Sequence, residues 1–486
     1  MGIAKVSGTA HANIAEVSDL AKANIAEISD AAANFVTYPA RTGMHNVGNE
    51  GGAAINIGYS VVVYDSAADR LIWAFEKQAS ANAGTQNKGY ILTSPVYYNP
   101  EDWGGGTVSN SADVYEPTPA GQLIHSQDVR PLAIGFDEST GVCMVVYQNV
   151  DDSKTYLQPF TVHTSTYAIT LGTLVEVADS LYTEAELMYD STMNRWTLIF
   201  TDSASPTVVS YKRISVTSAS SGGTVQAAGN ITVWGTTDAT GDGGTAVGRR
   251  GALAYCKGVG SAGDRIVAAG EYNGYNSLRA GTPDSDSWNY SGGDEHPITW
   301  GDVLNIDSSN HDTTVQWNDT DDYGLVLYQN ASNHLKCRAF TINTSDNSIV
   351  LQGASETTVY GGTVSDFSQL IYNADSAAKN FIAQYVRTVS SSPRGNFKQL
   401  TVDTSDYSIT VGSEIRWADL YIDMDPDSTT PTGSPITRFK GAFVAQPNQN
   451  GIIMMATEGG AGGSAGRLYT VWIAYTDNGT YARYTS

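Results

Sequence analysis

The chain has 486 residues and a formal net charge of −23, and it is rich in Gly, Ser, Thr, Asn, Asp and Tyr. The acidity argues against nucleic acid or an anionic membrane surface as a partner, because both bind through basic patches. No secretory signal follows Met1 and no apolar stretch is long enough to span a membrane, so we expect no membrane insertion. Cys143, Cys256 and Cys337 are far apart and odd in number, which predicts buried free thiols.

Residues 1–35 form an N-terminal segment built on an 11-residue repeat. The copies IAKVSGTAHAN, IAEVSDLAKAN and IAEISDAAANF place apolar residues at steps of three, four and four, a period of about 3.67 residues per helical turn. On a helix these residues would form one apolar stripe, which needs a partner to cover it. The residues predicted to dock on that partner are Ile3, Val6, Ile14, Val17, Ile25 and Ile28. Because Gly8 and two Ser-Asp steps weaken a continuous helix, a chain of short strand or helix fragments laid against another protein is equally allowed. Residues 36–52 are predicted to be a linker.

Residues 53–486 favour short strands and many turns over helices, which predicts an all-β domain. One hairpin signature recurs at Phe160–Gly172 (FTVHTSTYAITLG), Phe340–Gly353 (FTINTSDNSIVLQG) and Leu400–Gly412 (LTVDTSDYSITVG). Each copy has an alternating strand, a Thr-Ser corner and a second alternating strand that ends at or near Gly.

A second hairpin precedes the first kind and contains an aromatic residue, an Asp or Asn turn and a strongly apolar strand. Its copies begin at Val61, Leu132, Leu187, Leu253, Val315, Leu370 and Ala442. Two hairpins per unit give four strands, and seven such units predict a seven-bladed β-propeller of four-stranded blades over residues 53–486. We expect Ala53–Asp65 and Leu468–Tyr475 to close the ring together. A parallel β-helix or a two-sheet lectin-like fold is the alternative.

Aromatic residues follow apolar strands near the ends of several units, at Trp234, Trp300, Tyr360 and Trp417. A ring of blades needs large side chains where neighbouring sheets meet. These residues are therefore predicted to pack at blade junctions, and stacking on a ligand is the alternative.

The N-terminal units resemble short tandem repeats of the form IAKV(S/N)G at the N-termini of structural proteins of tailed bacteriophages. The likeness covers the first 35 residues, and the second and third copies depart from it by placing Ser-Asp where the turn Gly and Asn would be. The resemblance implies a virion protein of the tail or a fibre that is assembled in the host cytoplasm. It also implies that the N-terminus binds other virion proteins, and we expect several copies in the particle.

Residues with obvious catalytic chemistry are not found. The sequence lacks HExxH and GxSxG motifs, and the turns near Tyr64 and Tyr189 lack the Ser-x-Asp-x-Gly order of a sialidase Asp-box. We therefore predict no catalytic residues and no cofactor. The candidate ligands for Ca²⁺ are Asp423, Asp425 and Asp427 in the segment DMDPDS.

The leading hypothesis is a phage tail or fibre protein, not an enzyme, whose propeller acts as a host-surface adhesin or a spacer. Its many Tyr and Trp residues suit contact with host surface glycan. One alternative is a glycan-cleaving propeller enzyme of the depolymerase or sialidase type. The other is a structural protein that self-assembles through its N-terminal repeat.

Overall fold

The structure is a computed structural model. It describes residues 44–45, 56–78, 88–95, 122–202, 205–218, 222–225, 231–234, 252–259, 263–272, 274–283, 298–309, 313–373, 380–389, 392–416, 436–444, 451–458, 467–475 and 481–482. All regular structure in these ranges is β-strand, so the all-β prediction is confirmed. The same ranges contain no helix with the length and apolar character needed to cross a membrane.

An eight-stranded antiparallel sheet begins the ring. Its strands are β2 (Asn56–Asp65), β3 (Arg70–Gln78), β4 (Lys88–Pro95), β5 (Gln122–Asp137), β6 (Val142–Asn149), β7 (Lys154–Val162), β8 (Ile169–Leu171) and β9 (Val175–Ala178). Strand β5 pairs with β4 as far as Asp128 and with β6 from Val129 onward. The sheet therefore consists of two units that share one long strand.

Four five-stranded sheets follow, and each has three strands in sequence order and two further strands that both pair with the third. The first two sheets contain β10 (Tyr182–Asp190), β11 (Arg195–Asp202), β12 (Ser205–Ser218), β13 (Gly222–Val225), β14 (Ile231–Trp234), β15 (Ala252–Cys256), β16 (Arg265–Tyr272), β17 (Tyr275–Pro283), β18 (Ile298–Trp300) and β19 (Leu304–Asp307). The next two contain β20 (Thr313–Asn318), β21 (Tyr323–Gln329), β22 (Leu335–Ile342), β23 (Ile349–Leu351), β24 (Thr357–Tyr360), β25 (Val364–Asn373), β26 (Asn380–Val389), β27 (Ser392–Val402), β28 (Ile409–Val411) and β29 (Ile415–Arg416).

The last sheet joins the two ends of the described chain. Its strands are β30 (Ile436–Val444), β31 (Gly451–Glu458), β32 (Arg467–Tyr475), β33 (Tyr481–Ala482) and β1 (Met44–His45). Strands β1 and β33 both pair with β32, whereas β2 pairs with β3. The expectation that Ala53–Asp65 closes the ring together with Leu468–Tyr475 is therefore wrong for the first segment. Met44–His45 is the N-terminal strand that pairs with β32.

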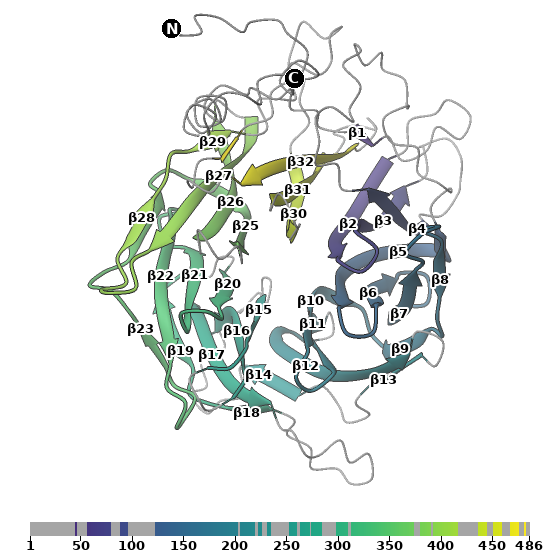
Figure 1. The fold of residues 1–486 in the computed structure, drawn as a ribbon, viewed down its shortest axis with the longest axis horizontal. Helices are drawn as coiled ribbons and strands as arrows, with labels where there is room; N and C mark the ends of the chain where they lie inside the picture. The colour runs from purple at the N-terminus through teal and green to yellow at the C-terminus, as the bar shows by residue number, and fades with distance from the viewer. Residues whose placement is uncertain are drawn as a thin grey trace, which may run out of the picture.

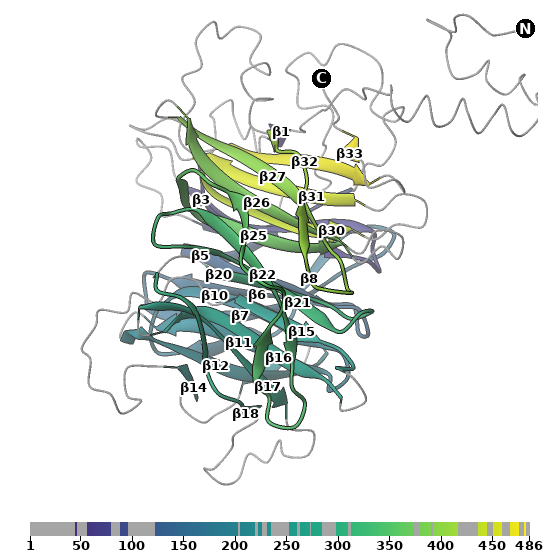
Figure 2. The same cartoon turned by 90° about the vertical axis from the view of Figure 1, so that its left-hand side faces the viewer.

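The sheets follow one another around a ring in chain order, and the first strands of most sheets lie nearest its middle (Figure 1). Contacts run from β2 to β5, β10, β15, β20, β25 and β30 in turn, and β30 contacts β2. Figure 2 shows the same ring from the side, with the strands crossing it obliquely. The fold is a propeller-like ring of antiparallel sheets.

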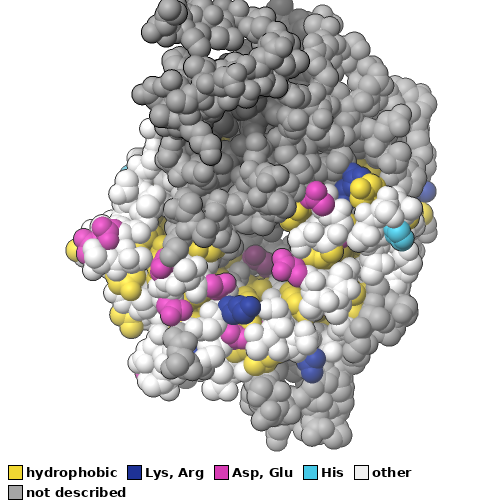
Figure 3. Space-filling view, viewed as in Figure 1, with side chains coloured by type: hydrophobic (Ala, Val, Ile, Leu, Met, Phe, Trp, Pro, Cys, Tyr) yellow, Lys and Arg dark blue, Asp and Glu magenta, His cyan; other side chains and the backbone are white. Residues whose placement is uncertain are grey.

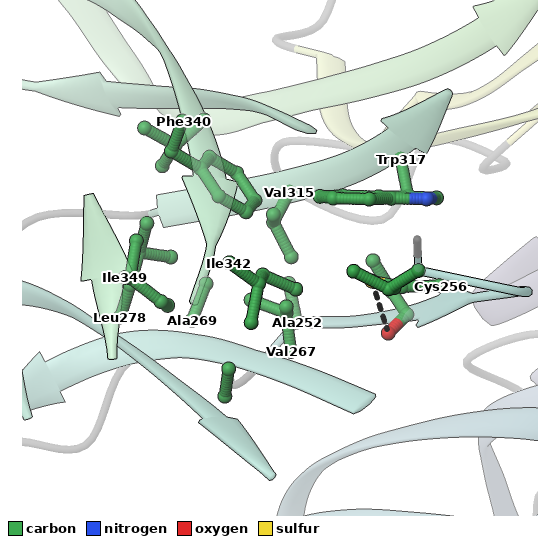
Figure 4. Close-up of a cluster of buried hydrophobic side chains, with 14 of the residues drawn as sticks. Ala252, Cys256, Val267, Ala269, Leu278, Val315, Trp317, Phe340, Ile342 and Ile349 are labelled. Atoms are coloured by element: carbon green, nitrogen blue, oxygen red, sulfur yellow. Dashed lines mark hydrogen bonds between the residues drawn. The ribbon is translucent and has the colours of Figure 1, made fainter. Parts of the chain in front are cut away.

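Neighbouring sheets bury each other, so the middle strand of a sheet is covered on both faces. Every residue of β6 and of β21 is buried, which explains the unbroken apolar runs in the sequence. Figure 4 shows one such junction, where Cys256 and Leu278 of one sheet pack with Trp317 and Phe340 of the next.

The cysteine prediction is confirmed. Cys143, Cys256 and Cys337 are free thiols with 0% exposure. Burial raises the pKa of the Cys143 and Cys256 thiols well above the ordinary value, so both stay neutral. They serve as small apolar core residues.

Two of the predicted junction aromatics pack between sheets as expected. The Trp300 ring meets Tyr211 of the preceding sheet edge-on, with the ring centroids 5.7 Å apart. Tyr360 stacks on Tyr385 of the following sheet at 5.5 Å. The side chain of Trp234, and Trp417 as a whole, lie outside the described residues.

Candidate functional site

The two sets of site residues predicted from the sequence lie outside the described residues. These are the partner-docking residues Ile3, Val6, Ile14, Val17, Ile25 and Ile28, and the candidate Ca²⁺ ligands Asp423, Asp425 and Asp427. Both predictions stay untested. Within the ranges that the structure describes, no three His, Cys, Asp or Glu side chains are grouped so that they could hold a metal ion.

The described chain does contain a repeated arrangement of turns, which we call the inner turns, between the first and second strands of four of the units. Each begins with a buried Asp or Asn whose Oδ1 accepts hydrogen bonds from two backbone N–H groups. These residues are Asp65, Asp137, Asp190 and Asn318. The fourth residue after each has positive φ, at Asp69, Gly141, Asn194 and Asp322. Asp and Asn suit the first position because they bind their own backbone, and Asp, Asn and Gly tolerate positive φ at the second.

Tyrosine hydroxyls contact the inner turn of the preceding unit across the sheet boundaries. The Tyr189 hydroxyl lies 2.9 Å from Ser139 Oγ of the preceding turn. In the same way the Tyr255 hydroxyl donates a hydrogen bond to Thr192 Oγ1 at 2.9 Å, and the Tyr372 hydroxyl donates one to Asn318 Oδ1 at 2.9 Å. Each tyrosine is the second-last residue of the first strand of its own unit. The recurring aromatic residue before the turn in the sequence was therefore the signal for this arrangement.

Carboxylates gather beside one of these contacts. Tyr255 donates to Asp264 Oδ2 at 2.7 Å, and the Lys257 backbone N–H donates to Asp319 Oδ1 of the next sheet at 3.2 Å. Figure 3 shows acidic side chains near the middle of one face of the ring, with a basic side chain among them. We call Lys257, Asp264 and Asp319 the acidic centre. It presents hydrogen-bond acceptors and one ammonium group to solvent.

Hydrogen bonding outweighs burial at Asp264. Burial alone disfavours the carboxylate, but hydrogen bonds from Thr192, Tyr255 and the Gly258 N–H group hold the pKa of Asp264 below its usual 3.8. The carboxylate is therefore charged at neutral pH and stabilises the junction between the sheets that carry Thr192 and Tyr255.

Replacing Asp264 with Asn is expected to lower the midpoint of thermal unfolding at pH 7. Because the folded pKa is lowered, the stabilisation is present above about pH 4 and is lost as the pH falls through the folded value. The difference between the parent chain and Asp264→Asn should therefore shrink between about pH 5 and pH 2. Scanning calorimetry over this range tests it, with Asp322→Asn as the matched exposed control. A difference that grows toward low pH would contradict the prediction.

The hairpins at the perimeter show the register expected from their repeated sequence. The equivalent pairs are Phe160 with Leu171, Phe340 with Leu351, and Leu400 with Val411. Each tip holds a residue with positive φ that contacts the preceding unit. These residues are Tyr167, Asn347 and Tyr407. The Arg70 Cζ atom lies 3.3 Å from the centroid of the Tyr167 ring. Arg265 Nε donates a hydrogen bond to Asn347 Oδ1 at 2.8 Å. The ring centroids of Tyr323 and Tyr407 are 6.1 Å apart. The tips therefore join neighbouring units.

No protein family matches the chain, and no curated protein matches it in sequence. Among solved structures, a putative 6-phosphogluconolactonase from Bacteroides fragilis is similar with a TM-score of 0.46 and 9% identity, over 81% of this chain and 92% of that one. A fucose-specific lectin from Aleuria aurantia has a TM-score of 0.41 and 12% identity, over 70% of this chain and 95% of the lectin chain. NanB sialidase from Streptococcus pneumoniae has a TM-score of 0.39 and 11% identity, over 90% of this chain and 70% of the sialidase chain.

Proposed function

We propose that this chain is a structural protein of a phage virion, in the tail or a fibre, which is anchored by residues 1–35 and displays a seven-bladed propeller. The observation that carries the proposal is the place where the chain enters the ring. Strand β1 pairs with the outer side of β32, at the perimeter of the last sheet. Residues 1–35 precede that perimeter strand in the sequence, so they can bind another protein without disturbing the packed sheets.

The strand contacts support the proposed number of blades. The strands that begin successive units are β2, the second part of β5, β10, β15, β20, β25 and β30, and each contacts the next. The contact between β30 and β2 completes the circuit. When the two units that share β5 are counted separately, these contacts support our proposal of seven blades.

The exposed chemistry supports a role in contact with the host surface. The acidic centre and the tyrosine hydroxyls are hydrogen-bond acceptors and donors of the kind that bind hydroxyl-rich glycan. The strongly negative chain also remains soluble when several copies are crowded in one particle. The displayed ring then acts as an adhesin or as a spacer.

Deletion of residues 1–35 tests the anchor. The variant keeps Met44 and His45, so the last sheet is complete and the ring is expected to fold with an unfolding midpoint close to that of the full chain. It should fail to join particles when it replaces the full chain during virion assembly, as measured by blotting purified particles. Particles that contain the shortened chain at the normal level would disprove the anchor.

A matched variant separates the effect of losing the apolar side chains of residues 1–35 from the effect of shortening the chain. Replacing Ile14, Val17 and Ile25 with Ser keeps the segment but removes its apolar side chains, and should also prevent incorporation. Turnover of host polysaccharide by the purified full chain, abolished by one Asp or Glu substitution in a loop, would replace the structural role with an enzymatic one.

A further inference from the structure

We infer that the closing strand β1 is exchanged between neighbouring copies, so that Met44–His45 of one chain completes the last sheet of a second copy. The inference rests on the proposed assembly of several copies in one particle. It concerns the outer edge of β32, where β1 and β33 lie, and its partner is a second copy of this chain.

Strand β1 contributes little to the ring it completes. It pairs with β32 only through Met44 with Tyr469 and His45 with Leu468. The inner circuit closes through β30 and β2, which contact each other without β1. Release of β1 therefore leaves the circuit of inner strands intact and exposes a short strand edge, which is a template for another strand.

The chain between β1 and β2 is long enough to reach another copy. Within one chain it must cross from the outer edge of the last sheet to β2 beside β30, three strand spacings and one sheet spacing, or about 24 Å in all. Residues 46–55 are ten residues, which extend to about 33–36 Å. The remaining length allows β1 to pair with the last sheet of a ring that lies alongside.

The exchange adds no new type of contact. The backbone pairs that β1 makes in its own chain form again in the neighbour, so the two closed forms have nearly equal energy per strand. The balance is then set by the local concentration of copies. A particle that holds several anchored copies side by side provides a high effective concentration.

Cysteines placed across the strand pair test the exchange. A chain with Met44→Cys and a second chain with Tyr469→Cys are mixed, refolded together and oxidised. Because the native cysteines are buried, the introduced pair is the main route to a disulfide. Exchange is expected to give a covalent dimer of twice the 51.6 kDa chain mass, more abundant as the protein concentration rises.

Three control chains accompany this test, and the first two show whether the geometry permits the bond. A single chain with both substitutions must form the disulfide, and a His45→Cys and Leu468→Cys chain covers the other register pair. Thr161→Cys with Thr170→Cys, which pair within one hairpin, should give only monomer. If the doubly substituted chain forms only internal disulfides and the mixture gives no dimer, exchange does not occur. That result would leave the anchor test by deletion of residues 1–35 unaffected.

Discussion

Replacing Asp190 with Asn is expected to lower the free energy of unfolding by about 3–5 kcal/mol. Asp190 Oδ2 lies 3.5 Å from Arg213 Nη2, and the two side chains are 0% and 2% exposed. Asn keeps the Oδ1 acceptor for the N–H groups of Thr192 and Met193, so the turn itself is retained. The substitution removes the negative charge beside the Arg213 guanidinium, and burial already lowers the pKa of that group. Urea unfolding of the purified variant measures the effect.

A matched variant and a double variant separate charge from turn geometry. Asp137 occupies the equivalent turn position and has no ion pair among the residues that the structure describes, so Asp137→Asn should cost less. Adding Arg213→Met to Asp190→Asn should recover most of the loss, because an apolar pair often replaces a buried ion pair without penalty. Equal losses for Asp190→Asn and Asp137→Asn would show that the ion pair contributes nothing beyond the turn.

Replacing Gly135 with Val is expected to destabilise the protein through a collision with Trp196 in the neighbouring sheet. A Cβ atom at position 135 would lie 2.4 Å from Trp196 Cζ3, and Trp196 is 1% exposed and cannot move aside. Overpacking of this kind costs about 1–3 kcal/mol. Truncation of the other partner, Trp196→Ala, should cost about 3–5 kcal/mol because it leaves a cavity.

The two positions are expected to be coupled. Gly135→Val combined with Trp196→Leu should be more stable than the sum of the single losses, since the smaller side chain makes room for the larger one. Thermal unfolding of the four chains in this cycle measures the coupling. Gly361→Ala is the control, because its Cβ would lie 3.8 Å from the nearest atom, in ordinary contact. Strict additivity would mean that the two side chains do not limit each other.

The features that the sequence predicted well are local. The inner turns depend on an Asp or Asn that binds its own backbone, as at Asp137, and this chemistry is visible in a few consecutive residues. The perimeter hairpins were equally clear, because alternation of apolar residues around a Thr-Ser corner determines both turn and register. Burial of Cys256 followed from the apolar run that contains it.

The features that the sequence did not reveal depend on distant partners. Strand β1 is two residues long in a Gly- and Asn-rich stretch, and it becomes a strand only because β32 offers an edge. Arg213 lies in an alternating polar segment that is typical of a surface strand, and only the turn at Asp190 explains its burial. The acidic centre likewise joins residues of two sheets, Asp264 and Asp319, that no local pattern connects.

Strand β5 has a consequence for cooperativity. It runs without a loop from the outer side of one unit, where it pairs with β4, to the inner side of the next, where it pairs with β6. Elsewhere the described strands belong to one five-stranded sheet each, so a single unit could open while its neighbours persist. The two units that share β5 cannot part in this way, and they should melt together as one indivisible block.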